Sequence, residues 1–82
     1  MPEITRFYGI VITMYFKEHN PPHFHAAYGE YKGEFDLNSL KMVKGKLPNK
    51  AQKLVVEWAN EYKKELLDMW KTQKFIHLKP WE

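Results

Sequence analysis

The feature that most constrains the fold is a single apolar stripe in the C-terminal half of the chain. Within residues 49–72, apolar side chains recur at spacings of three and four, at Ala51, Val55, Trp58, Tyr62, Leu66 and Met69. This spacing predicts one long amphipathic α-helix, because side chains three and four positions apart share one face of a helix. Such a helix must cover an apolar surface that the rest of the chain supplies.

The N-terminal half supplies that surface as strands. Stretches rich in β-branched and aromatic residues are residues 4–8, 10–16, 23–28 and 32–37, with a further short one near residues 41–44. These residue types favour strands, whereas the adjacent prolines Pro21 and Pro22 predict a loop. We therefore expect an α+β fold, a small antiparallel sheet of three to five strands packed by one long amphipathic helix.

Alternation inside the second stretch predicts which side chains reach the core. Residues of one parity, which would face the helix, are Ile10, Ile12, Met14 and Phe16. The other parity places Val11, Thr13 and Tyr15 on the opposite face. Near the C-terminus, residues 74–79 also alternate, which predicts an edge strand ended by Pro80.

Length and composition limit the class of protein. A chain of 82 residues with 44% hydrophobic residues is expected to form a single domain, residues 1–82. The absence of cysteine excludes disulfides, cysteine nucleophiles and cysteine-ligated zinc. Neither a signal peptide nor a membrane-spanning stretch is recognisable, so we expect a cytoplasmic protein without membrane contact.

The basic residues of the middle segment are a candidate nucleic-acid contact. Five lysines without acidic neighbours are Lys41, Lys44, Lys46, Lys50 and Lys53, in a chain of net charge +3. Such a segment is either an ordinary solvated surface or a patch that follows phosphates. Both interpretations remain open from the sequence.

A histidine-rich segment is the only local group of residues that predicts chemistry. It reads His19-Asn20-Pro21-Pro22-His23-Phe24-His25. If residues 23–25 are extended, both imidazoles project from one face about 6.6 Å apart at their roots. His23 and His25 would then suit acid–base catalysis or anion binding, and with His19 they would suit a divalent metal. Alternatively, the rings only shape the turn.

Acidic partners for these histidines lie on the predicted hairpin. Glu34 and Asp36 share one face of their strand and could meet the histidines across the hairpin. The strand register that would decide this stays open at the level of sequence.

The same segment, extended to Ala26, resembles a family of short bacterial proteins known only as a domain of unknown function. The resemblance continues through Tyr28-Gly29-Glu30-Tyr31, Phe35-Asp36-Leu37, Gly45-Lys46-Leu47-Pro48 and Leu54-Val55-Val56-Glu57-Trp58-Ala59. It implies no reaction, cofactor or catalytic residue. It does imply a partner, because family members are often encoded beside a second small protein, in an arrangement similar to a toxin–antitoxin pair.

Three functions follow from these observations. The first is an interaction module of a two-gene, toxin–antitoxin-like system that binds its neighbour's product or a second copy of itself, and contacts nucleic acid through its lysines. Its apolar contact surface would be Val11, Thr13 and Tyr15, or Trp81 with Phe75. The second is a metal-independent ribonuclease with His23 and His25 as acid and base. The third is a protein that binds a divalent metal through its histidines, as a metal-dependent fold or as a hydrolase. No other cofactor is expected.

Overall fold

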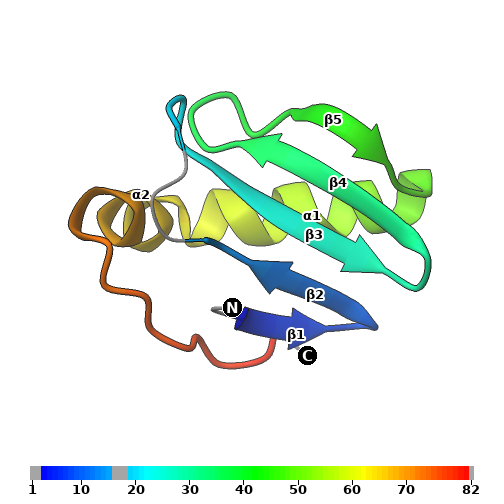
Figure 1. Ribbon diagram of the computed structural model, residues 1–82. Helices are drawn as coiled ribbons and strands as arrows, with labels where there is room; N and C mark the ends of the chain where they lie inside the picture. Colours follow the sequence, from blue (N-terminus) through cyan, green and yellow to red (C-terminus); the bar gives the residue numbers. More distant parts are fainter. Residues whose placement is uncertain (1–2, 16–18, 82) are drawn as a thin grey trace.

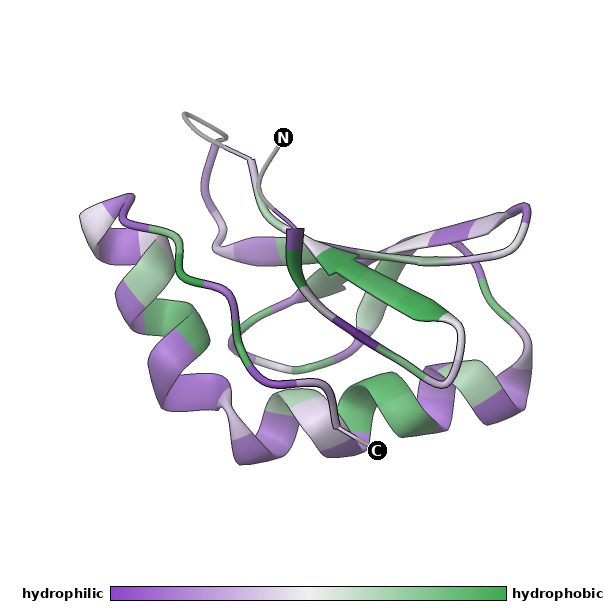
Figure 2. Ribbon diagram, turned by 90° about the horizontal axis from the view of Figure 1, so that it is seen from below, coloured by the Kyte–Doolittle hydropathy of each residue, from purple (hydrophilic) through white to green (hydrophobic). Residues whose placement is uncertain are grey.

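The computed structural model describes residues 3–15 and 19–81. Its elements are β1 (Glu3–Phe7), β2 (Ile10–Thr13), β3 (His23–Tyr28), β4 (Tyr31–Asp36), β5 (Met42–Lys46), α1 (Asn49–Glu61) and α2 (Lys63–Thr72). The strands form one antiparallel sheet in the order of the sequence, and both helices lie on the same side of it (Figures 1 and 2). The predicted α+β class with an antiparallel sheet is confirmed.

The prediction of one long helix over residues 49–72 is wrong, because the helix breaks at Tyr62. This residue leaves the helical region with φ −106° and ψ 17°, although its N–H still bonds to Trp58 O at 3.1 Å. A straight helix over that span would be about 36 Å long, more than the 31 Å longest extent of the molecule. The bend turns α2 back toward the sheet (Figure 2). No helix among the described residues is long and apolar enough to cross a membrane.

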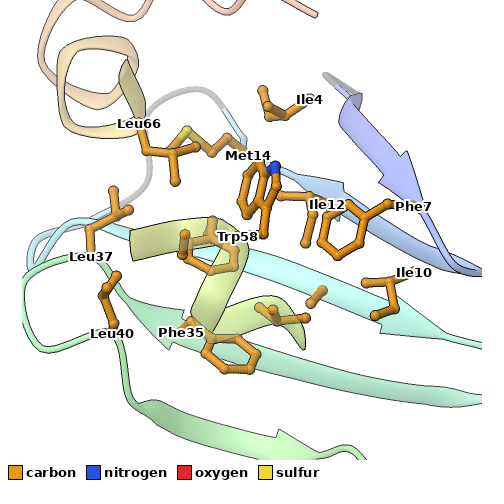
Figure 3. Packing of buried hydrophobic residues seen from close by; sticks show 14 of the residues in the cluster. Ile4, Phe7, Ile10, Ile12, Met14, Phe35, Leu37, Leu40, Trp58 and Leu66 are labelled. Carbon is orange, nitrogen blue, oxygen red and sulfur yellow. The ribbon is translucent and has the colours of Figure 1, made fainter. Parts of the chain in front are cut away.

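The core lies between the sheet and the helices, with Trp58 at its centre (Figure 3). The Trp58 ring lies 5.5 Å from that of Phe7 and 5.9 Å from that of Phe24, measured between centroids. Phe24 in turn stacks on Phe35 at 5.2 Å. The predicted inward residues of β2 and the segment after it, Ile10, Ile12 and Met14, are all fully buried. Phe16, predicted to join them, lies outside the described residues.

Two strands end more than one residue away from the position expected from the sequence. β2 ends at Thr13, so the ladder with β3 stops at the pair Thr13–His25. β5 begins at Met42 and extends to Lys46. At Gly45, φ is +87°, and a Cβ there would collide with the backbone carbonyl of Lys32. Glycine at this position therefore permits the close approach of β5 to β4.

The predicted edge strand at residues 74–79 is also wrong, because the tail contains no strand. It runs back beside β1 (Figure 1), and the contacts that hold it there include hydrogen bonds from Leu78 N–H to Ile4 O at 2.7 Å and from Thr5 Oγ1 to Lys79 O at 3.2 Å. Its partly buried apolar residues are Phe75, Leu78 and Trp81. They recur every third position, whereas a strand with one buried face needs every second.

Candidate functional site

The outer face of the sheet, opposite the helices, carries a row of polar side chains. In the strand register, Thr13 pairs with His25, His25 with Glu34, and Glu34 with Lys44. Directly paired residues of antiparallel strands point to the same face. Because Phe24 beside His25 is buried in the core, this row lies on the side away from the helices.

Two histidines and one carboxylate converge in this row. Nε2 of His23 and Nδ1 of His25 each lie 3.8 Å from Oε1 of Glu34. The two imidazole rings are 5.3 Å apart between centroids and inclined at 74°. One ligand atom from each of the three residues lies within 4.8 Å of the others. The structure thus brings the predicted pair together and adds Glu34 to it; in the rest of this article these residues are called the His–Glu cluster.

The orientation of His23 is fixed by the proline loop and by α2. Nδ1 of His23 lies 2.8 Å from the carbonyl oxygen of Pro21, which can only accept a hydrogen bond, so the proton is on Nδ1. Nε2 is thereby directed toward Glu34. The ring of Trp70 from α2 lies 5.0 Å from the His23 ring, and its Nε1 donates to Asn20 Oδ1 at 3.2 Å. His23 is held on both sides.

Asp36 lies opposite His23 in the ladder, but its carboxylate serves the following turn. Oδ1 of Asp36 accepts from the backbone N–H of Asn38 at 2.7 Å and from that of Ser39 at 2.9 Å. The Ser39 bond is the main reason that the pKa of Asp36 is lowered, with smaller contributions from Asn38 and His23. Of the two acidic residues considered in the sequence, Glu34 is the one whose carboxylate oxygen lies close to ligand atoms of both histidines.

The other predicted ligand and the predicted lysines are only partly brought to this site. His19 is exposed and lies outside the His–Glu cluster as the described residues define it. Of the five predicted lysines, Lys44 is in the row beside Glu34, and Lys46 pairs with Lys32 two residues along the strands. The rest are exposed elsewhere, Lys41 before β5 and Lys50 and Lys53 on α1.

A groove of about 410 Å³ adjoins the cluster on the outer face. Its floor is apolar and small, with Val11, Ala27 and Gly33 among its residues. Its polar lining comes from Thr13, Tyr15, His25, Lys32, Glu34 and Lys44. Tyr15 meets His25 edge to face, with ring centroids 4.8 Å apart. Two members of the His–Glu cluster, His25 and Glu34, therefore line an open groove.

The pairing of His25 with Glu34 could have been predicted from the sequence, whereas the contact of Trp70 with His23 could not. A two-residue turn at Gly29-Glu30 pairs Tyr28 with Tyr31, and counting back from it places His25 opposite Glu34. The length and residue types of this turn therefore determine how β3 and β4 pair. The contact of Trp70 with His23 was not predictable, because it follows the bend at Tyr62 and the sequence has no proline or glycine there.

Comparison with known proteins gives a family without an assigned activity. Residues 9–71 match the family described as a domain of unknown function, DUF4160. No curated protein and no solved structure matches the chain. The match spans most of the chain and includes the whole His–Glu cluster and Trp70. The chain therefore belongs to this family, and the resemblance seen in the sequence is confirmed at that level.

Proposed function

We propose that this member of the DUF4160 family binds a divalent transition-metal ion through His23, His25 and Glu34. The observation that supports the proposal is the convergence of three ligand atoms within 4.8 Å. Two imidazoles and a carboxylate form a donor set that suits zinc and its neighbours in the first transition series. Metal–ligand bonds of about 2.0–2.2 Å would draw the three atoms together by small side-chain rotations.

The electrostatics of His23 support a cation at this place. With its proton on Nδ1, a neutral His23 directs the Nε2 lone pair toward Oε1 of Glu34, 3.8 Å away. Two electron-rich atoms that face one another repel, and a cation between them converts the repulsion into attraction. A histidine that donates its other N–H to a backbone carbonyl is also the usual arrangement of a metal ligand, because the bond fixes the tautomer.

The site would leave coordination positions open toward the groove. Structural zinc sites have four protein ligands, whereas catalytic ones have three and keep a position for water or substrate. The side chain of His23 is only 10% exposed, but those of His25 and Glu34 are 29% and 25% exposed and line the groove. A metal here would polarise an oxygen atom bound from that side. We infer a catalytic type of centre rather than a structural one.

Calorimetric titration of zinc into untagged, chelator-treated protein tests the proposal. We expect one ion per chain, and at least tenfold weaker binding in His25→Ala and in Glu34→Gln. Glu30→Gln is the matched control, because it makes the same change on an exposed residue of the β3–β4 turn. Unchanged binding in the Glu34 and His25 variants, or no binding by the wild type, would contradict the proposal.

A metal-independent ribonuclease is the second candidate. A proton on Nε2 of His23, in place of a metal ion, would also make the contact with Oε1 of Glu34 attractive. The supporting observation is that one carboxylate lies 3.8 Å from both imidazoles and would orient them. One histidine would take the proton of a ribose 2′-hydroxyl as that oxygen attacks phosphorus. The other would protonate the leaving 5′-oxygen as its bond to phosphorus breaks. RNA cleavage that persists in chelator and is lost in His23→Ala would favour this candidate over the metal.

A separate proposal concerns the partner expected from the resemblance. In it, this protein is one half of a toxin–antitoxin-like pair and binds the other half. It is supported by β5, an edge strand that no other described strand pairs on its outer side, with Val43 59% exposed. An exposed edge with an apolar side chain is able to accept a further strand. Co-expression with the product of the neighbouring gene tests it. We expect a complex that Val43→Lys weakens, and two proteins that elute separately would contradict it.

A further inference from the structure

The groove beside the His–Glu cluster carries cations that the proposed metal site does not use. Lys32 and Lys44 both line it. In the register, Lys44 lies opposite Glu34, but Lys46 lies opposite Lys32. Like charges directly opposite one another destabilise a sheet. The Lys32–Lys46 pair is therefore a local conflict that a bound anion would relieve, and such conflicts occur most often at functional sites.

The repulsion between Lys32 and Lys46 cannot be relieved by moving the strands apart, because β5 would lose its backbone hydrogen bonds to β4. Gly33 pairs with Gly45, between the Glu34–Lys44 and Lys32–Lys46 pairs. The absence of a side chain at Gly45 lets the strand approach the Lys32 carbonyl. The two glycines thus hold the lysines of both strands close together over the groove.

We propose that this groove binds single-stranded nucleic acid and directs one phosphate to the metal held by the His–Glu cluster. Lys44 and Lys46 are two positions apart on one strand, or about 6.8 Å, so they can meet successive phosphates of an extended strand. Tyr15 offers an aromatic ring in the same groove. Lysines along a backbone and an aromatic ring for base stacking are the usual elements of single-strand recognition. This inference rests on the metal site proposed above.

The groove favours a single strand over a duplex. Stacking on Tyr15 requires an exposed base face, and the bases of a duplex are stacked on one another. The side chains of Val11 and Ala27 on the floor carry no polar group, so the flat face of a base can lie against them. RNA and DNA share the phosphodiester chemistry that the lysines recognise, so the experiment includes both.

Metal and phosphate should bind cooperatively. Without a cation, the Glu34 carboxylate lines the same groove as Lys32 and Lys44, and its negative charge repels a phosphate. A divalent ion on Glu34 reverses the local sign and gives the phosphate an oxygen-binding position. By linkage, the oligonucleotide must then tighten the metal by the same factor as the metal tightens the oligonucleotide.

Fluorescence anisotropy with a labelled octanucleotide tests the inference, in RNA and DNA form and as a duplex, with zinc and with chelator. We expect single strands to bind at least tenfold more tightly with zinc and the duplex to bind weakly. Lys44→Ala/Lys46→Ala should lose at least tenfold in affinity. It should also lower the slope of log K against log salt by about 1.4, since each phosphate contact on a single strand contributes about 0.7. Tyr15→Ala should weaken binding more than Tyr15→Phe.

The matched control is Lys50→Ala/Lys53→Ala, which removes the same charge from exposed positions of α1. We expect it to change the affinity less than twofold. Equal losses in the two double variants, or equal binding of duplex and single strand, would overturn the inference. If zinc binds normally but oligonucleotides do not, the proposal of a nucleic-acid groove is wrong and that of the metal site stands. If lysine-dependent binding persists in a protein that takes no zinc, the metal site is wrong and the lysine groove stands.

Discussion

Nδ1 of His25 lies 3.8 Å from Oε1 of Glu34, the residue directly opposite it in the β3–β4 ladder. The same oxygen lies 3.8 Å from Nε2 of His23. All three residues belong to paired strands, so their Cα positions are fixed by backbone hydrogen bonds and not by a mobile loop. A constellation on rigid elements is preorganised for a ligand.

Zinc should stabilise the folded protein. A ligand that binds only the native state adds about 2.7 kcal/mol of stability at a concentration of 100 times its Kd. In a domain of this size, about 1 kcal/mol corresponds to a Tm shift of 4–8 °C. We expect a Tm increase of about 10 °C or more in the wild type, measured by differential scanning fluorimetry, and little increase in His25→Ala. An equal increase in both proteins would show that zinc binds elsewhere.

Trp70→Phe should weaken metal binding without removing a ligand. The variant keeps a ring against His23 but loses the indole N–H that donates to Asn20 Oδ1. Loss of one such bond costs about 1 kcal/mol of stability, and loss of outer-shell support lowers metal affinity by about tenfold. Calorimetry with zinc measures the second effect.

Trp81→Phe is the control for that prediction. Trp81 packs on Phe7 at a centroid distance of 5.6 Å, at the β1 edge of the sheet. This variant removes an indole N–H from a residue outside the His–Glu cluster and should leave zinc affinity unchanged. If both tryptophan variants lower the affinity equally, Trp70 has no specific role in placing His23.

What could be predicted from the sequence is what depends on local periodicity. The stripe that includes Val55 and Trp58 indicated a helix, and the alternation at Ile10 and Ile12 indicated a strand, because each pattern needs only neighbouring residues. The break at Tyr62 was not predictable in this way. No proline or glycine lies at this position, and only the tertiary structure shows that the chain turns there.

The candidate site likewise has one part that the local sequence pattern predicts and one part that depends on the tertiary structure. His23 and His25 share a face by strand alternation alone, and this pairing was predicted. Glu34 joins them only through the register of the hairpin, and the sequence left the choice between Glu34 and Asp36 open. The structure decides it through the turn after β4, whose backbone N–H groups bind Asp36. Nothing in the sequence alone indicated which carboxylate that turn would require.

Gly45→Ala should destabilise the protein more than Gly29→Ala. Both glycines have positive φ, +87° and +59°, and an L-residue there costs about 1–2 kcal/mol. At Gly29 a Cβ meets nothing within 4 Å, whereas at Gly45 it collides with the Lys32 carbonyl. Crowding of this kind adds about 1–3 kcal/mol. Urea denaturation measures both variants, and equal losses would mean that β5 does not need its close approach to β4.

The ion pair of Glu3 and Arg6 should contribute to stability in a pH-dependent way. Arg6 Nε and Nη2 donate to the two carboxylate oxygens at 2.9 and 3.0 Å. This hydrogen bonding, ahead of the charge of Arg6 and the contact with His77, holds the pKa of Glu3 below its usual value. A carboxyl whose pKa is lower in the folded state stabilises the protein above the unfolded pKa, about 4.3 for glutamate. The contribution disappears as the pH falls through the lower, folded pKa.

Glu3→Gln should therefore have a lower Tm than the wild type near pH 7, and the difference should narrow as the pH falls below about 4. Thermal unfolding followed by circular dichroism from neutral to strongly acidic pH measures it. Arg6→Gln removes the other partner and should show the same narrowing, and the double variant should add little because the two residues share one interaction. High salt should reduce the difference, since the pair is exposed. A difference that stays constant with pH would mean that Glu3 acts through packing of the tail beside β1 and not through its charge.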